Sequence, residues 1–149
     1  ILQIFFEKNK SIVAQMLLPC SYIRYYNKEL RKACELGNER TVGLLLIEGL
    51  ANPADAQSAC LLEAVLGGHD RVVWKLLIDN RVNIDDQNYH IVREALAERH
   101  YRILSDFMDS RFRTRPSKEK WMEILKDIPP NETDVIQRVT ALIEQNYRQ

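Results

Sequence analysis

Short blocks of apolar residues recur along this chain at helical spacing, with polar turns between them. Residues 30–34 and 61–65 each place apolar side chains at positions i, i+3 and i+4. Such positions fall on one face of an α-helix, so each block predicts a helix that buries one side. A glycine follows each block, Gly37 after the first and Gly68 after the second. Glycine readily adopts the left-handed conformation that ends many helices, so we expect both helices to stop there.

The two blocks belong to a repeat with a period of 31 residues. The matched pairs are Leu30 with Leu61, Ala33 with Ala64, Gly37 with Gly68, Arg40 with Arg71, Val42 with Val73, Leu45-Leu46-Ile47 with Leu76-Leu77-Ile78, and Asn52 with Asn83. A weaker third copy follows after another 31 residues, with Val92 and Ala95 in the Leu and Ala positions and Arg99 in place of the glycine. A partial copy, residues 8–18, lies upstream at a shift of 29. The sequence therefore predicts one structural unit repeated along the chain.

Each copy predicts two short helices. The second helix, residues 42–48 in one copy and 72–79 in the next, is apolar over most of its surface, so we expect it to be buried between its neighbours. Polar turn segments, residues 51–55 and 82–86, lead on to the next copy. One such unit cannot bury its own apolar face, whereas a stack of units buries a continuous core. The predicted fold class is therefore all-α, an α-solenoid of stacked helix-turn-helix repeats.

The repeat resembles the ankyrin repeat. Gly68-His69 followed by residues 73–85 is similar to the family's pattern of Gly-His, an apolar pair, Lys, three leucines, Glu, Asn, Gly, Ala, Asp, Val and Asn. Residues 42–55 follow the same frame. The resemblance covers residues 1–112, with full copies near 27–57, 58–88 and 89–112 after a truncated first one. The family's Thr-Pro-Leu-His opening is absent, and the period is 31 rather than about 33, so another kind of α-solenoid is the alternative.

The resemblance implies a protein-binding function. Ankyrin-like stacks present their turn tips and first helices on one concave side, and family members bind proteins there. The corresponding turn-tip residues of this chain are Asn52, Asp55, Gln57, Asp85, Asp86, Asn88 and Tyr89. The corresponding first-helix residues are Arg31, Glu35, Leu62, Glu63, Leu66 and Arg93. Leu62 and Leu66 are the apolar candidates for a binding hot spot, and the alternative is that they pack against the neighbouring repeat.

The period stops at Ser110, and residues 113–149 predict a pair of helices that cover the open end of the stack. Ser117 is expected to cap a helix over residues 118–127. The apolar stripe of that helix is Trp121, Ile124, Leu125 and Ile128. Asn131 with Asp134 resembles a cap before a last helix. That last helix is expected to bury Ile136, Val139, Leu142 and Ile143.

Composition narrows the classes of partner. Lysine plus arginine equals aspartate plus glutamate, 21 against 21, so no general attraction to nucleic acid or anionic membrane follows. The basic stretch 111–120 is expected to be a solvated linker, with contact to phosphates or an acidic partner as the alternative. Three cysteines without a Cys-x-x-Cys pair favour a reducing, cytoplasmic location with the thiols as small core residues. No apolar run is long enough for a membrane span.

No set of residues indicates catalysis. Neither His69, His90 nor His100 forms an i, i+4 pair or has a carboxylate or cysteine cluster beside it, so no metal site is expected. His69 follows a glycine turn, where its ring is expected to brace the loop. We therefore expect a binding protein without enzymatic activity or cofactor. The chain opens on Ile1 without a methionine, which favours a piece of a longer protein. The alternative function is accordingly a targeting or scaffold segment of a larger protein, such as a bacterial or viral effector acting in the host cytosol.

Overall fold

The computed structural model describes residues 20–47, 49–79, 81–82, 84, 86–112 and 115–148, with side chains from residue 24 on except those of residues 56, 57, 86 and 87. In this part of the chain all regular secondary structure is α-helical, which confirms the all-α prediction. None of these helices is long and apolar enough to cross a membrane. The chain divides into two compact units, residues 1–83 and 84–149.

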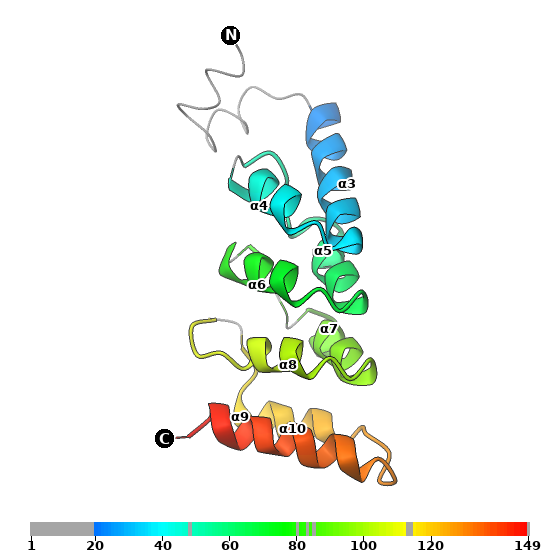
Figure 1. Cartoon of the computed structure of the whole chain (residues 1–149), viewed down its shortest axis with the longest axis vertical. Helices are drawn as coiled ribbons and strands as arrows, with labels where there is room; N and C mark the ends of the chain where they lie inside the picture. The colour runs from blue at the N-terminus through cyan, green and yellow to red at the C-terminus, as the bar shows by residue number, and fades with distance from the viewer. Residues whose placement is uncertain are drawn as a thin grey trace. The chain divides into compact units, whose positions relative to one another are not determined.

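The described residues of unit 1 form two pairs of helices. The first pair is α3 (Cys20–Leu36) with α4 (Glu39–Ile47), and the second is α5 (Asp55–Leu66) with α6 (Asp70–Asp79). Helix α3 packs on α4 and α5, and α6 packs on α4 and α5 (Figure 1). The first helices of the two copies, α3 and α5, therefore lie side by side, and so do the second helices, α4 and α6. This arrangement is expected when one copy of a repeat stacks on the next.

The core of unit 1 consists of the predicted first-helix faces together with part of each second helix. Its buried first-helix side chains are Leu30, Ala33, Cys34, Cys60, Leu61, Ala64 and Val65. Its buried second-helix side chains are Val42, Leu45, Val72, Val73, Leu76 and Leu77. The spacing i, i+3, i+4 thus predicted the first-helix contacts correctly, because those helices have one apolar face each.

The second helices are less buried than expected. Leu44, Ile47 and Ile78 are 54%, 64% and 53% exposed. Helix α4 packs on α3 and α6, and these contacts cover only the stripe that carries Val42 and Leu45. The expectation that the second helices are buried between their neighbours is therefore correct only in part, because an apolar outer stripe is left exposed.

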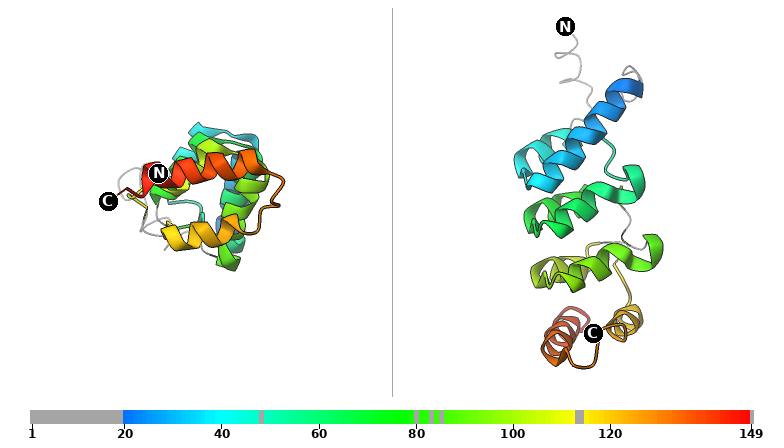
Figure 2. Two further views of the ribbon diagram at one scale, coloured as in Figure 1. Left: turned by 90° about the horizontal axis from the view of Figure 1, so that it is seen from below. Right: turned by 90° about the vertical axis from the view of Figure 1, so that its right-hand side faces the viewer.

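Unit 2 contains the third copy and the tail. Its helices are α7 (Asp86–Ala97), α8 (Tyr101–Phe107), α9 (Lys118–Leu125) and α10 (Thr133–Asn146). Helix α7 packs on α8, and α10 packs on both α8 and α9 (Figure 2). The tail helices therefore share one compact unit with the last repeat, because α10 contributes its apolar stripe to the α8 side of the core.

The turn between the two helices of a copy is the same in all three. Gly37, Gly68 and Arg99 have φ values of +72°, +71° and +59°. The amide that follows each of them donates to a carbonyl five residues back, at 2.9–3.0 Å, and the acceptors are Ala33, Ala64 and Ala95. This bond and the left-handed residue are the features of the Schellman helix end. The third copy keeps the turn even with an arginine in the glycine position.

A second left-handed position also follows the period. Ser58 in α5 and Tyr89 in α7 have φ values of +62° and +58°, and they occupy equivalent places in successive copies. Both helices therefore turn out of line near their start, and the first turn projects from the helix body in Figure 2. Asn88, beside Tyr89, is also left-handed, with a φ value of +56°. Neither Ser58 nor Tyr89 is glycine or asparagine, the types that adopt this conformation most often, so residue type did not predict the periodic position.

The tail follows the prediction in part. Ser117 caps α9, and its hydroxyl accepts a hydrogen bond from the Lys120 amide at 3.1 Å. Helix α9 ends at Leu125 rather than at residue 127, because the next amides bond three residues back and form a turn. The expected cap at Asn131 and Asp134 is wrong, since the N-cap of α10 is Glu132 and its side chain makes no cap bond.

Burial in the tail is also partly as predicted. Trp121, Ile124 and Leu125 are buried as expected, whereas Ile128 is half-buried. In α10 the buried residues are Val135, Val139 and Ile143, and the predicted Ile136 and Leu142 are half-buried.

Candidate functional site

In unit 1 the structure brings the predicted first-helix residues onto one face. Arg31 of α3 lies 3.5 Å from Glu63 of α5, an ion pair between neighbouring copies. Glu35 is exposed one turn further along α3. This face carries charges of both signs.

The two predicted hot-spot leucines differ in burial. Leu66 is 42% exposed, whereas Leu62 is half-buried. A hot spot in an interface needs an apolar side chain that is accessible before binding and fully covered afterwards. Leu66 therefore meets the first requirement in unit 1 better than Leu62 does.

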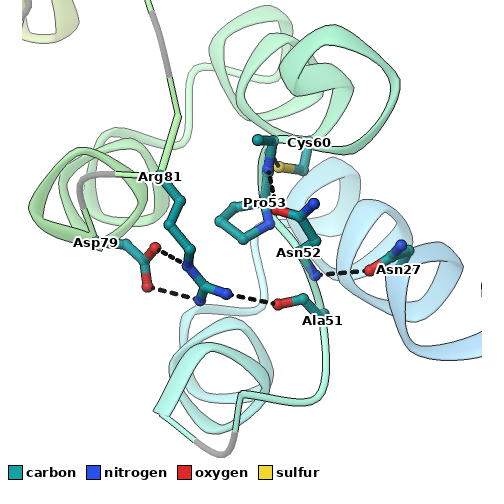
Figure 3. Close-up of polar contacts among 8 residues, drawn as sticks. Asn27, Ala51, Asn52, Pro53, Cys60, Asp79 and Arg81 are labelled. Atoms are coloured by element: carbon teal, nitrogen blue, oxygen red, sulfur yellow. Dashed lines mark hydrogen bonds and ion pairs between the residues drawn. The ribbon is translucent and has the colours of Figure 1, made fainter. Parts of the chain in front are cut away.

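The predicted turn-tip residues of unit 1 take part in a hydrogen-bonded turn (Figure 3). The Asn52 amide donates to the Asn27 side chain at 2.7 Å, and the Asn52 side chain accepts from the Ala54 amide at 3.0 Å. Asn52 thus has a structural role that exposure alone did not indicate. Asp55, the first residue of α5, is exposed and leaves its carboxylate on the surface.

Residues of the next copy also form hydrogen bonds with this turn. Arg81 pairs with Asp79 and donates to the Ala51 carbonyl at 3.3 Å, and the Cys60 thiol donates to the Pro53 carbonyl at 2.8 Å (Figure 3). These contacts fix the turn against both neighbouring helices, so its exposed side chains are presented on a rigid backbone.

Cys34 and Cys60 are core residues, as expected, and the side chain of Cys20 lies outside the described residues. Cys34 and Cys60 are 0% and 4% exposed. A hydrogen bond with Cys60, followed by burial, raises the pKa of the Cys34 thiol far above its ordinary value. A thiol with a raised pKa carries almost no thiolate at neutral pH and is a poor nucleophile.

His69 braces the loop of the preceding copy, as expected. Its Nε2 lies 3.0 Å from the Glu35 carbonyl oxygen. A methyl group added to Gly37 would lie 2.4 Å from the ring, and one added to Gly67 would lie 2.5 Å from it. The described residues include no group of three or more histidine, cysteine or acidic side chains placed to hold a metal ion.

In unit 2 the predicted residues lie around the start and middle of α7. Asn88 is exposed, and Tyr89 is half-buried with the Lys120 ammonium 5.5 Å from its ring centre. Arg93 donates to the Asn88 carbonyl at 3.0 Å and forms an ion pair with Asp127. The predicted Asp85 lies outside the described residues, as do the side chains of Gln57 and Asp86.

A groove of about 350 Å³ lies beside Arg93. Its apolar lining is Leu96, Ala97, Ile124, Ile128, Pro129 and Val135. Its rim carries two ion pairs, Arg93 with Asp127 and Arg99 with Glu132, the latter at 3.8 Å. An apolar floor with charged groups at the rim is the composition expected of a site that binds a protein segment.

Sequence reasoning identified only one rim residue of this groove. Asp127, Ile128 and Glu132 come from the loop between α9 and α10, which lies more than thirty residues from Arg93 in the chain. The period could not predict this contact, because the loop lies outside the repeat.

In the basic stretch Arg111 and Lys118 are exposed, as expected of a solvated linker, whereas Arg115 and Lys120 are half-buried. Arg111 binds Asp109, Arg115 donates to the Met108 carbonyl, and Lys120 lies near Glu123. These cations are engaged within unit 2.

Comparison of the chain with protein-family models, curated proteins and solved structures finds no match in any of the three.

Proposed function

We propose that this chain is a protein-binding module of ankyrin-like helical repeats, which holds a segment of a partner protein against its first helices. The observation that carries the proposal is the groove beside Arg93. It is about 350 Å³ in volume, within the range of ligand-binding pockets. Arg93 was one of the residues that the resemblance to ankyrin repeats assigned to the binding side.

The groove suits a peptide segment with one apolar anchor and charged neighbours. Leu96 and Ile124 give its floor an apolar surface, while the carboxylate of Asp127 is 63% exposed at the rim. An anchor side chain that enters the groove displaces water from apolar surface, and the flanking charges set the orientation of the segment. Leu66 and the Arg31–Glu63 pair offer a comparable surface in unit 1.

The test is affinity capture from cell lysate with quantitative mass spectrometry, comparing the wild-type chain with Ala97→Arg. Ala97 is exposed and lines the groove, so the arginine fills the groove without disturbing the core. We expect proteins captured by the wild type to be lost with Ala97→Arg, by about tenfold or more.

Met122→Arg is the matched control. Met122 is 45% exposed on α9 and is not part of the groove lining, so this variant should retain the wild-type partners. An unchanged set of partners with Ala97→Arg, in a protein whose circular dichroism and melting temperature match the wild type, contradicts the proposal.

A further inference from the structure

Unit 1 has a second groove, on the outer face of its second helices. Its volume is about 340 Å³. The lining residues are Gly43, Leu46 and Ile47 from α4 and Lys75, Ile78 and Asp79 from α6. Helices α4 and α6 lie side by side (Figure 1). Because both helices contribute lining residues, the groove follows the line between them.

One end of this outer face is apolar. Ile47 and Ile78 are 64% and 53% exposed, and Leu44 beside them is 54% exposed. Ile47 and Ile78 occupy equivalent positions in successive copies, so the repeat itself places two large apolar side chains on either side of the groove. Gly43 forms part of the floor, and the Lys75 ammonium lies over it, 3.0 Å from the place a methyl group would occupy.

The other end of the outer face is basic. Arg40 and Arg71 are equivalent in successive copies, and Lys75 follows Arg71 by one turn. Glu39 lies 3.9 Å from Arg71 and 3.8 Å from Lys75, at long ion-pair distances. Asp70 is the only other described carboxylate in the first turns of α4 and α6, so three cations lie with two carboxylates at this end of the face. The third carboxylate, Asp79, lines the groove at its apolar end and is paired with Arg81. The N-termini of the two helices add positive potential.

We propose that this outer groove binds an amphipathic helix of a partner protein that is acidic at one end. A third helix laid along the line between two packed helices places its side chains in their groove, with anchors at i, i+4 and i+7. The apolar anchors cover Ile47 and Ile78, and the acidic end faces Arg71 and Lys75. This surface is distinct from the groove beside Arg93, so the inference does not depend on the function proposed above.

A second copy of this chain fits the face less well. In a two-fold dimer this face would pair with the same face of a second molecule. The cations of one molecule would then lie against the cations or the apolar residues of the other, and neither arrangement is complementary. An anionic membrane also fits less well. The apolar residues of a membrane-binding helix project into the lipid, whereas Ile47 and Ile78 are walls of a groove.

The experiment uses the intact chain and a designed helical peptide of about 14 residues, with leucines at i, i+4 and i+7 and glutamates at one end. Fluorescence anisotropy gives the dissociation constant, which we expect between about 1 and 100 μM. Backbone amide shifts in NMR spectra of the wild-type chain should move at Gly43, Ile47 and Ile78. A peptide with lysines in place of the glutamates should bind at least about fivefold more weakly.

Variants then test the two ends separately. Ile78→Glu should weaken binding of the acidic peptide by at least about tenfold, because it places a charge where the anchors lie. Lys75→Glu with Arg71→Glu should weaken binding of the acidic peptide and strengthen binding of the lysine peptide, a reversal that unfolding cannot produce. Ala97→Arg, in the other groove, should leave both affinities unchanged.

Three outcomes overturn the inference. The first is equal affinity for the acidic and the lysine peptide. The second is amide shifts confined to residues outside α4 and α6. The third is the absence of peptide binding combined with an Ile78-dependent dimer in sedimentation equilibrium or Ile78-dependent binding to phosphatidylserine vesicles. Loss of the first-helix partners with Ala97→Arg has no bearing on these results, so the two proposals fail separately.

Discussion

At Gly37 a left-handed backbone and the close approach of an imidazole ring coincide. The φ value is +72°, and the His69 ring fills the space that a side chain would need. The equivalent position of the third copy tolerates Arg99, whose side chain reaches toward Glu132 at 3.8 Å. The glycine at position 37 is therefore required by the ring above it as well as by the turn.

Gly37→Ala should lower the free energy of unfolding by about 2–3 kcal/mol. Left-handed strain accounts for about 1–2 kcal/mol, and displacement of the His69 ring with its hydrogen bond adds about 1 kcal/mol. In a His69→Ala background the same change should cost about 1 kcal/mol less. Urea unfolding of the four proteins of this double-mutant cycle measures the difference. Strictly additive effects would show that the ring does not restrict position 37.

Asp109 and Arg111 give a second prediction at the scale of residues. The Arg111 guanidinium donates to both carboxylate oxygens, at 3.0 and 2.8 Å, and the Arg111 amide donates at 2.9 Å. Hydrogen bonds from the Arg111 side chain are the main reason that the pKa of Asp109 falls to about 2. Because the pKa is lower in the folded state, the stabilisation is complete above the ordinary value of 3.8 and is lost as the pH falls toward 2.

An NMR titration of the Asp109 carboxyl carbon should therefore have its midpoint near pH 2. Arg111→Gln should raise the midpoint toward the ordinary 3.8, because the hydrogen bonds from the Arg111 side chain are the largest cause of the lowered pKa. A wild-type midpoint at 3.8 is the result that rules out the ion pair in solution.

At the scale of elements, the hydroxyl group of Tyr147 connects the last two helices, α9 and α10. The Trp121 indole of α9 donates to the Tyr147 hydroxyl at 2.7 Å, and that hydroxyl donates to the Pro116 carbonyl. The Arg115 guanidinium lies 4.2 Å from the centre of the Tyr147 ring. Burial raises the pKa of Tyr147 above its ordinary value, so the hydroxyl stays protonated as a donor. This arrangement fixes α10 against α9 at the end where α10 stops.

Tyr147→Phe should destabilise the protein by about 1–3 kcal/mol, because the fully buried Trp121 side chain keeps its N–H donor and loses the acceptor. Tyr25→Phe is the matched control. Tyr25 is 55% exposed, and a surface change of this kind stays within about 0.5 kcal/mol. Urea unfolding followed by circular dichroism measures both. Equal effects of the two substitutions would show that the hydroxyl does not join α9 to α10.

The sequence predicted the existence of these elements more reliably than their ends. The cap at Ser117 was predictable because a serine before a helix bonds an amide three residues later whatever the fold. The true start of α10 was not predictable from the asparagine at residue 131. The loop that contains this residue lines the groove beside Arg93, and Glu132 is the N-cap of the helix.

At the scale of the whole molecule, we expect the proposed repeats to act as one stack. The two compact units each hold one tryptophan, Trp74 in α6 and Trp121 in α9. If all copies stack into a solenoid, each interface stabilises its neighbours and the chain unfolds as one cooperative system. If the units are independent, each has its own midpoint.

We expect a single transition. In a Trp74→Phe variant, fluorescence from Trp121 follows unit 2 alone, while far-UV circular dichroism follows every helix. The two signals should give the same urea midpoint within about 0.2 M. A circular dichroism curve with two steps, of which fluorescence follows only one, would contradict the proposed continuous stack.

What the sequence determined by itself was local and periodic. The period of 31 residues, the buried faces of the first helices and the left-handed helix ends at Gly37 and Gly68 follow from residue types at fixed spacing. The tertiary structure alone decided which stripe of the second helices is exposed, that the loop after α9 forms a groove with Arg93, and that Tyr147 joins Trp121. The last two features depend on contacts between residues 34 and 26 positions apart, outside the matched positions of the repeat, so no spacing in the sequence encodes them.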